Sequence, residues 1–172
     1  ALVADSTCDL NEEEIKKYFP KARTIRMDMD TTANKGSHEK MLRAFRDGEC
    51  EILLGTQMIA KGLDYPNVTL VGVLYADTGL FSGNYRGSET TFQLLTQVAG
   101  RSGRGEQAGH AIIQTFNPDH YAIQYASHHD YAGFYVAEMH YRHTGKYPPY
   151  RFLATVTFSA RTLEFAEAYA LR

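Results

Sequence analysis

Two arginines, Arg101 and Arg104, stand three positions apart after an apolar run with helical spacing. Each guanidinium group is planar and permanently charged, so it can donate two parallel hydrogen bonds to phosphate oxygens. The two groups repel each other unless an anion lies between them, and the small residues Ser102 and Gly103 let a ligand approach the backbone. This pattern favours a triphosphate site. The alternative is a hydrated basic helix end, where arginine interacts favourably with the helix dipole.

A second candidate site is the long polar loop over Gly55–Asp64, which follows a short apolar run. Ligands of open α/β sheets bind at the carboxyl ends of the strands. Donors suited to a phosphate backbone are Thr56, Gln57 and Lys61. In addition, Gly62 permits close approach of a ligand, and Asp64 can accept from a ribose hydroxyl or a metal-bound water. An ordinary surface loop is the alternative, although loops of this length commonly have a function.

The composition of the 172 residues is ordinary for a globular chain, with 44% hydrophobic and 22% charged residues. The net charge of −2 means that any nucleic-acid contact is a local patch. Cys8 and Cys50 form no CxxC pair, which argues against a zinc finger or a disulfide framework and suits the cytoplasm. The sequence shows no membrane-spanning stretch and no secretory leader. Because it lacks an initial Met and stops inside a helical pattern, we expect a piece of a longer protein.

The elements that must position these residues alternate between strand and helix. Apolar runs and period-two alternation predict strands at 1–4, 24–29, 51–54, 68–75 and 111–116, the last two of them buried. The predicted helices begin at Asn11, at Ser37 as N-cap with Gly48 closing, and at about Glu89. This order predicts an α/β fold with an open, mainly parallel sheet of about five strands and helices on both faces.

The region after Asn117 is rich in tyrosine and histidine. We interpret the tyrosines at helical spacing as packing residues rather than a base-stacking platform: Tyr121 with Tyr125 and Tyr131 with Tyr135. No metal site is predicted, because no zinc-type spacing recurs around Glu138, His140 and His143.

A domain boundary is predicted near Gly145–Pro149, which gives one domain over 1–146 and the start of another over 147–172. Beyond the boundary, Arg151–Ala160 alternates like a strand and Arg161–Arg172 has helical character.

Several long strings, in the right order along the chain, resemble one family of motor proteins. Ile52–Gly62 with Pro66–Val71 resembles helicase motif V, and Gln97–Arg104 resembles motif VI. Both motifs are similar to those of superfamily-two helicases, and their sequences are most similar to the PriA family of primosomal replication-restart helicases. Further matching strings are Arg26–Thr32, Lys35–Lys40, Ala76–Asp77, Gln114–Pro118 and Tyr147–Tyr150. The resemblance covers roughly Tyr18–Ala160.

The resemblance implies the second RecA-like lobe of the motor, a P-loop NTPase-type fold, followed by a short α+β extension. In that family ATP and Mg²⁺ lie between two lobes, and the second lobe supplies arginine fingers. Carried over to this chain, Arg101 and Arg104 would meet the γ-phosphate, and Gln97 would help to place it. The nucleotide side would be lined by Gly62, Asp64 and Gly100, and the DNA backbone would be contacted by Thr56, with Gln57 and Lys61 beside it.

As a whole, the resemblance implies an ATP-dependent DNA helicase of replication restart and primosome assembly, located in the cytoplasm. The implied partners are single-stranded and branched or forked DNA, other primosome proteins and single-strand-binding proteins, with no membrane.

Three features depart from the family pattern. The chain has no G-x-x-x-x-G-K-[ST] loop and no D-E-x-H motif, so the ATP site needs a missing first lobe and this fragment alone is expected to be inactive. The zinc-binding cysteines are absent, so zinc is expected in full-length members but not on these residues. Asp5–Leu10 instead resembles the opening of DegV-type fatty-acid-binding proteins. The alternative function is therefore a non-catalytic binding module, either a nucleic-acid clamp or a fatty-acid-binding protein.

Overall fold

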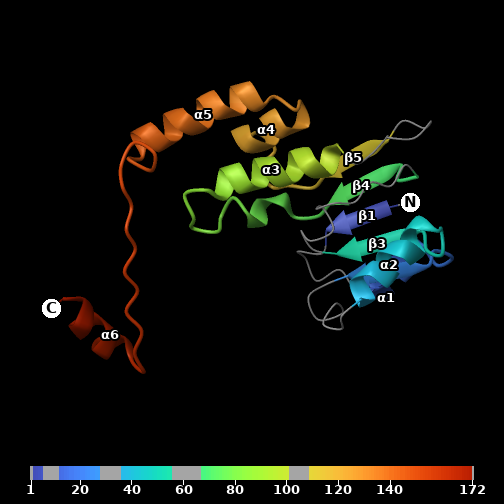
Figure 1. The fold of residues 1–172 in the computed structure, drawn as a ribbon, viewed down its shortest axis with the longest axis horizontal. Coiled ribbons are helices and arrows are strands. Elements are labelled where there is room, and N and C mark those ends of the chain that lie inside the picture. Colours follow the sequence, from blue (N-terminus) through green and yellow to red (C-terminus); the bar gives the residue numbers. More distant parts are fainter. Residues whose placement is uncertain (1, 6–11, 28–35, 56–66, 101–108, 172) are drawn as a thin grey trace. The chain divides into compact units, whose positions relative to one another are not determined.

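The computed structural model describes residues 2–5, 12–27, 36–55, 67–100 and 109–171 (Figure 1). Its strands are β1 (Leu2–Asp5), β2 (Thr24–Met27), β3 (Ile52–Gly55), β4 (Leu70–Val73) and β5 (His110–Ile113). Its helices are α1 (Glu12–Tyr18), α2 (Ser37–Arg46), α3 (Gly87–Ala99), α4 (Tyr121–Ser127), α5 (Tyr131–Thr144) and α6 (Leu163–Ala170), with a short 3-10 helix, η2 (Ala76–Thr78), after β4.

The strands form one sheet in the order β2-β3-β1-β4-β5, and every neighbouring pair is parallel. Parallel neighbours need crossover connections, and α1, α2 and α3 lie in the crossovers that follow β1, β2 and β4. The strand ends are level: Asp5 at the end of β1 is paired in register with Gly55 of β3 and Val73 of β4. This sheet confirms the predicted α/β fold with five parallel strands.

Helices cover both faces of the sheet, as predicted. Leu53 of β3 is completely buried and packs in a cluster with Phe45 of α2. Its neighbours Ile52 and Leu54 pack in a different cluster with Ile15 of α1. Because successive residues of a strand point to opposite faces, α1 and α2 lie on opposite sides of the sheet.

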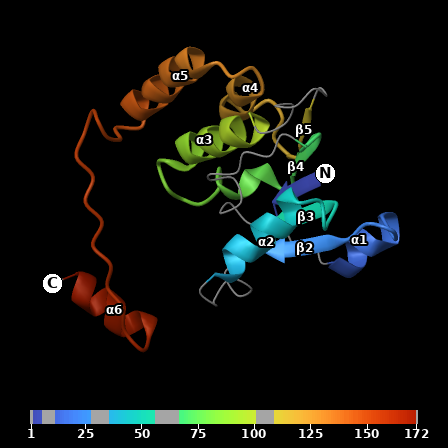
Figure 2. The ribbon, with the colours of Figure 1, turned by 45° about the vertical axis from the view of Figure 1, so that its right-hand side comes forward.

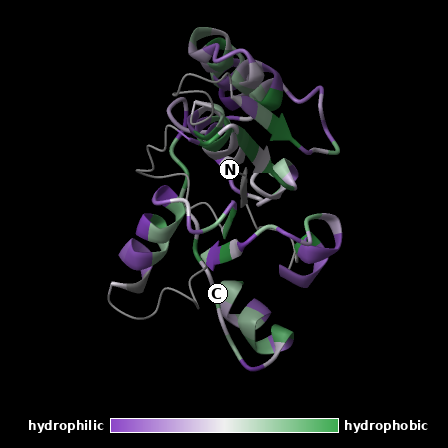
Figure 3. Ribbon diagram, turned by 90° about the vertical axis from the view of Figure 1, so that its right-hand side faces the viewer, coloured by the Kyte–Doolittle hydropathy of each residue, from purple (hydrophilic) through white to green (hydrophobic). Residues whose placement is uncertain are grey.

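A third apolar cluster joins the end of β4 to the helices that follow. Phe92 and Leu95 of α3, Ala122 of α4 and Phe134 of α5 are buried in it. The rings of Phe92 and Phe134 stack with their centroids 4.0 Å apart. Figures 1 and 2 both show α3 and α4 side by side. Figure 3 shows that the helices carry both hydrophobic and hydrophilic residues, as expected when one face of a helix packs against a core.

Glycines set both ends of α2. Gly36 is the N-cap in a left-handed conformation with φ of 92°, so the predicted cap, Ser37, is instead the first helical residue. Glycine adopts this conformation without a steric penalty, which lets the chain enter the helix one residue early. At the other end Gly48 has φ of 78° and donates to the Phe45 carbonyl at 3.2 Å, which confirms the predicted glycine closure.

Two predicted strands differ from the structure. β5 was expected to be buried, but it lies at the edge of the sheet and exposes His110, Ala111 and Ile112. An apolar run does not reveal which strand will lie at an edge. Arg151–Ala160 forms no strand in the described part of the chain, where its residues are exposed and no neighbouring strand pairs with it. Alternation is not sufficient for a strand, because the backbone also needs hydrogen-bonding partners.

The chain packs as two compact units, Ala1–Glu138 and Met139–Arg172. In the second unit α6 starts after Thr162, whose hydroxyl accepts a hydrogen bond from the Phe165 N–H at 3.5 Å. This confirms a terminal helix, somewhat shorter than predicted. The division into 1–146 and 147–172 stays a prediction. Within the described residues, no helix has both the length and the apolar character needed to cross a bilayer.

Candidate functional site

The first candidate site begins at the carboxyl edge of the sheet. β3 ends at Gly55, which is level with Asp5 of β1 and Met27 of β2 at the carboxyl edge. Gly55 is buried, and the strand that carries it is buried along its whole length. The predicted DNA contacts, Thr56, Gln57 and Lys61, lie outside the described residues. The predicted nucleotide contacts Gly62 and Asp64 also lie outside them.

The second candidate site begins at the end of α3. Phe92 and Leu95 of this helix pack near the carboxyl end of β4, beside Val73 and Ala76. One turn later, Val98 also packs with Val68 and Val71, near the amino end of β4. α3 therefore runs antiparallel to the strands, as Figure 1 shows.

The end of α3 brings two predicted site residues to the amino edge of the sheet. Gln97 lies in the last turn of α3 and is half-buried, and Gly100 is the residue that ends the helix. The next described segment, from Gly109, enters β5 at the same edge. Arg101 and Arg104 lie outside the described residues.

The two candidate sites therefore start from opposite edges of the sheet. β3 and β4 both run toward the carboxyl edge, so the chain leaves at Gly55 and returns at the amino edge by Leu70. Ligands of open α/β sheets bind at the carboxyl ends of the strands, and the connection from β3 to β4 begins at that edge. Gln97 and Gly100 lie at the opposite edge, so this rule does not account for them. The segment that enters β4 and the C-terminal end of α3 both lie at the amino edge.

Gly100 is not required to be glycine by the fold of the described residues. It adopts a right-handed conformation, with φ of −70° and ψ of −1°, which any residue can adopt. A Cβ at this position would meet the Thr96 carbonyl oxygen at 3.4 Å, an ordinary contact distance. The predicted contact between Gly100 and the nucleotide stays a prediction.

A buried carboxylate, Asp77, was missed by sequence reasoning. It lies in η2, just after β4, and only 2% of its surface is exposed. The carboxylate accepts three hydrogen bonds: from the Thr115 hydroxyl at 3.0 Å, the Phe116 N–H at 2.9 Å and the Asn117 amide nitrogen at 2.7 Å. These bonds connect the carboxyl ends of β4 and β5. The sequence offered two signals, an acid shortly after a buried strand and the family-like string Ala76–Asp77, but the donors to Asp77 lie about forty residues away.

The hydrogen bonds also determine the charge of Asp77. Burial alone would raise the pKa of this carboxyl group, because it disfavours the ionised form. The donors from Asn117, Phe116 and Thr115 outweigh burial and hold the pKa below its usual value. Asp77 is therefore ionised at neutral pH and serves as a fixed, fully paired anion at the carboxyl edge.

The tyrosine-rich region divides into packing residues and exposed residues. Tyr121 and Tyr125 are half-buried and pack against the third apolar cluster, which agrees with their interpretation as packing residues. The Tyr121 hydroxyl donates to the buried Glu138 carboxylate at 2.6 Å. Tyr131 and Tyr135 are exposed. Within the described part of the chain, no three His, Cys, Asp or Glu side chains gather in a way that could hold a metal ion.

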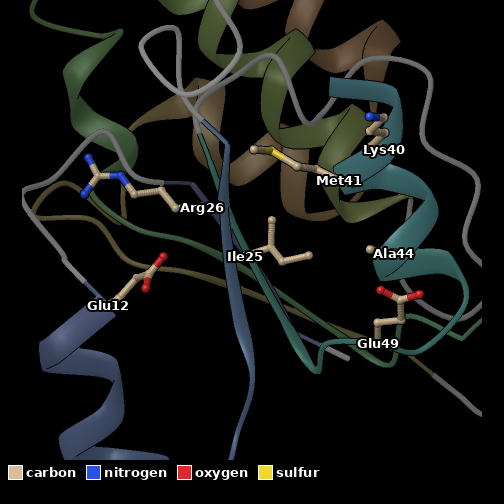
Figure 4. Close-up of a pocket in the computed structure, with 7 residues that line it drawn as sticks. All are labelled: Glu12, Ile25, Arg26, Lys40, Met41, Ala44 and Glu49. Atoms are coloured by element: carbon tan, nitrogen blue, oxygen red, sulfur yellow. The ribbon is translucent and has the colours of Figure 1, made fainter. Parts of the chain in front are cut away.

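An open hollow beside the edge strand β2 contains none of the predicted site residues. Figure 4 shows its lining side chains, which come mainly from β2 and α2. They combine an apolar floor with two acids and two bases: Ile25, Met41, Ala44, Glu12, Glu49, Arg26 and Lys40. Balanced charge and an open shape give no preference for an anionic ligand.

Comparison with known proteins shows the family to which the chain belongs. Residues 2–106 match the model of the helicase conserved C-terminal domain. The replication restart protein PriA of Bacillus subtilis (strain 168) is 62% identical over 148 residues, which cover 86% of this chain and 18% of that protein. The PriA of Chlamydia pneumoniae is 50% identical over 139 residues, which cover 81% of this chain and 19% of that protein.

Among solved structures, the C-terminal domain of the DEAD-box protein Dbp5 is similar with a TM-score of 0.49 and 19% identity, over 73% of this chain and 65% of that one. The chain spans about a fifth of the length of the curated relatives it matches. The chain belongs to the helicase conserved C-terminal domain family, and the replication restart proteins PriA are its relatives.

Proposed function

We propose that this chain is the second motor lobe of an ATP-dependent DNA helicase that acts in replication restart and primosome assembly. The observation that carries the proposal is the 62% identity to a replication restart protein over 86% of the chain. The parallel sheet with helices on both faces supports it, since this is the fold that the resemblance implies. The family match includes Asp5–Leu10, which favours the helicase interpretation of that segment over a fatty-acid-binding one.

In this proposal ATP and Mg²⁺ bind between this lobe and a first lobe. Arg101 and Arg104 act as arginine fingers on the γ-phosphate, where they stabilise the charge that develops during phosphoryl transfer. Gln97 helps to place the γ-phosphate. Its position in the last turn of a helix packed on the sheet supports this role, because α3 is anchored by buried Phe92 and Leu95.

The remaining residues divide between nucleotide and DNA. Gly62, Asp64 and Gly100 line the nucleotide, and the described ends of their segments, Asn67 and Gly100, lie toward the same edge of the sheet. The proposed DNA-backbone contacts are Thr56, Gln57 and Lys61, which follow β3 in the sequence, and β3 ends at the carboxyl edge. Single-stranded and forked DNA, primosome proteins and single-strand-binding proteins are the proposed partners, in the cytoplasm. Zinc belongs to parts of the full-length relatives other than these residues.

The two-lobe arrangement predicts that the isolated chain hydrolyses no ATP above background, because half of the ATP site is absent from it. The measurement is steady-state ATPase activity with single-stranded DNA present, with circular dichroism to show that the chain is folded. The intact protein is the positive control and should show DNA-stimulated turnover. DNA-stimulated turnover by the isolated chain, after removal of contaminating ATPases, would contradict the proposal.

The proposed backbone contacts predict a sequence-independent effect. Lys61→Ala in the intact protein should weaken DNA binding about equally for all sequences and make the salt dependence shallower by about one unit, as expected for one lost phosphate contact. The matched control is Lys17→Ala, which removes an exposed lysine of α1 and should change neither quantity. Fluorescence anisotropy over a salt series measures both. A changed sequence preference with an unchanged salt slope would show that Lys61 does not contact phosphate.

A further inference from the structure

Tyr75 has a strained backbone at the carboxyl edge of the sheet. Its φ of 60° and ψ of 57° place it in the left-handed region, which is unusual for a bulky residue. Such residues persist only where the surrounding structure holds them, and they gather at functional sites. Here the Tyr75 carbonyl oxygen accepts from the Thr78 N–H at 3.4 Å and the Thr78 hydroxyl at 3.1 Å. The strain turns an aromatic side chain out of the sheet, where 44% of it is exposed.

A second exposed aromatic residue meets it. Phe116 follows β5 and is 75% exposed, and its ring packs edge to face against Tyr75 with the centroids 5.6 Å apart. Phe116 is also fixed through its backbone, because its N–H donates to the buried Asp77 carboxylate. The Ala76 N–H, next to Tyr75, donates to the Gln114 carbonyl at 3.0 Å. A buried, fully paired anion thus fixes the backbone beneath two exposed rings.

The surroundings of this pair favour a planar polar ligand over an apolar protein surface. Thr78 and Gln114 beside the rings are exposed, and Asn117 is half-buried. Two exposed rings with polar neighbours are suited to stacking on nucleobases, because every base has a π-face and polar edges. An extended apolar patch, by contrast, would favour a protein partner.

The position along the sheet favours single-stranded DNA as the base-bearing ligand. β3 ends at Gly55, the residue before the proposed backbone contacts in the sequence, and β4, which Tyr75 follows, ends at the same edge. One strand, β1, lies between them, so the strand axes are about 10 Å apart. A DNA strand that crosses the carboxyl edge would pass the ends of both β3 and β4.

We propose that Tyr75 and Phe116 form a base-stacking contact for single-stranded DNA at the carboxyl edge, held in place by Asp77 as a positioning residue. The inference rests on the proposed function and adds a base contact to its backbone contacts. It assigns a role to the strain at Tyr75, the exposure of Phe116 and the burial of Asp77, none of which the phosphate contacts use.

The test compares two DNA probes on the intact protein by fluorescence anisotropy: an oligothymidine and an abasic oligonucleotide of the same length. Phe116→Ala should weaken oligothymidine binding about tenfold, the effect of losing one stacked base, at an unchanged salt slope. Abasic binding should change by less than about twofold, because the backbone contacts remain. Tyr75→Gly should act in the same direction without loss of folding, since glycine accepts φ of 60° without strain. Phe116→Tyr should bind like the wild type, and so should the control Phe19→Ala, which removes an exposed ring after α1.

The outcomes separate this inference from the proposed function. If the wild type binds oligothymidine and neither ring variant changes the affinity, the stacking contact is wrong and the helicase proposal stands. If the ring variants weaken both probes equally, the rings do not contact bases and the inference is also overturned. If the wild type binds neither probe, the proposed function fails together with the inference.

The positioning role of Asp77 has its own readout. Asp77→Asn should weaken oligothymidine binding but not abasic binding in the wild-type background, because it disturbs the backbone that carries the rings. In the Phe116→Ala background the same change should add little, since residues that act as a unit are not additive. A full additional loss in that background would overturn the positioning role.

Discussion

Replacing Arg101 or Arg104 by alanine in the intact protein is expected to lower DNA-stimulated ATP turnover about a thousandfold, the low end for arginine fingers. The reason is that a finger arginine stabilises charge that develops only in the transition state. DNA binding without nucleotide should be nearly unchanged, because the proposed role of the pair is to contact the nucleotide and not the DNA. Lysine should rescue little at either position, since it offers a point charge without the planar fork of the guanidinium. Steady-state ATPase assays and anisotropy measure the two quantities.

The competing account is structural, with the arginines tied to neighbouring acids. It predicts a lower melting temperature and intact turnover per folded molecule, so both should be measured on the same variants. Arg43→Ala is the matched control, because Arg43 is an exposed arginine of α2 paired with Glu39 at 3.5 Å. Exposed pairs of this kind contribute about 0.3–0.5 kcal/mol, so neither turnover nor melting should change much. A sharp loss of stability with normal turnover in the Arg101 or Arg104 variants would contradict the finger role.

The fold was predictable from the sequence wherever local patterns decide it. Short apolar runs identified β3 and β4, and Gly48 marked the end of α2, because each of these features depends on residues that are close together in the sequence. The exposure of β5 was not predictable, since its place at the edge follows from the order of all five strands. The same limit applies to Arg151–Ala160, whose alternation describes a strand only where another strand pairs with it.

The candidate sites were predictable in part. Gln97 lies at the end of the helix predicted from the apolar run before it, and the structure adds that this end lies at the amino edge. Asp77 could not be predicted, because its three donors come from residues 38 to 40 positions away. Contacts over such distances follow from the sheet order, which places β4 beside β5. Of the other predicted site residues, only Gly100 lies within the described residues, and the roles of Gln97 and of all the others stay predictions.

Replacing Asp77 by alanine is expected to lower the free energy of opening of the β4–β5 edge by about 2–4 kcal/mol. Three donors would lose a charged acceptor, and a buried donor without a partner costs about 1–3 kcal/mol. Hydrogen exchange of the amides in β4 and β5 measures this in the intact protein, where global unfolding is not two-state. The control Asp119→Ala removes an exposed acid of the same segment and should change the opening free energy by less than about 0.5 kcal/mol.

The pH dependence gives a second, independent signature of the same carboxylate. Because folding lowers the pKa of Asp77, its ionised form stabilises the folded state fully above the unfolded pKa of about 3.9. The contribution is lost as the pH falls below that value and through the folded pKa. In the wild type, protection of the β4 and β5 amides against hydrogen exchange should therefore decrease on acidification below about pH 4. The Asp77→Ala variant should not show the decrease that comes from protonation of Asp77. Equal protection in wild type and variant at neutral pH would show that the three hydrogen bonds do not hold the edge together.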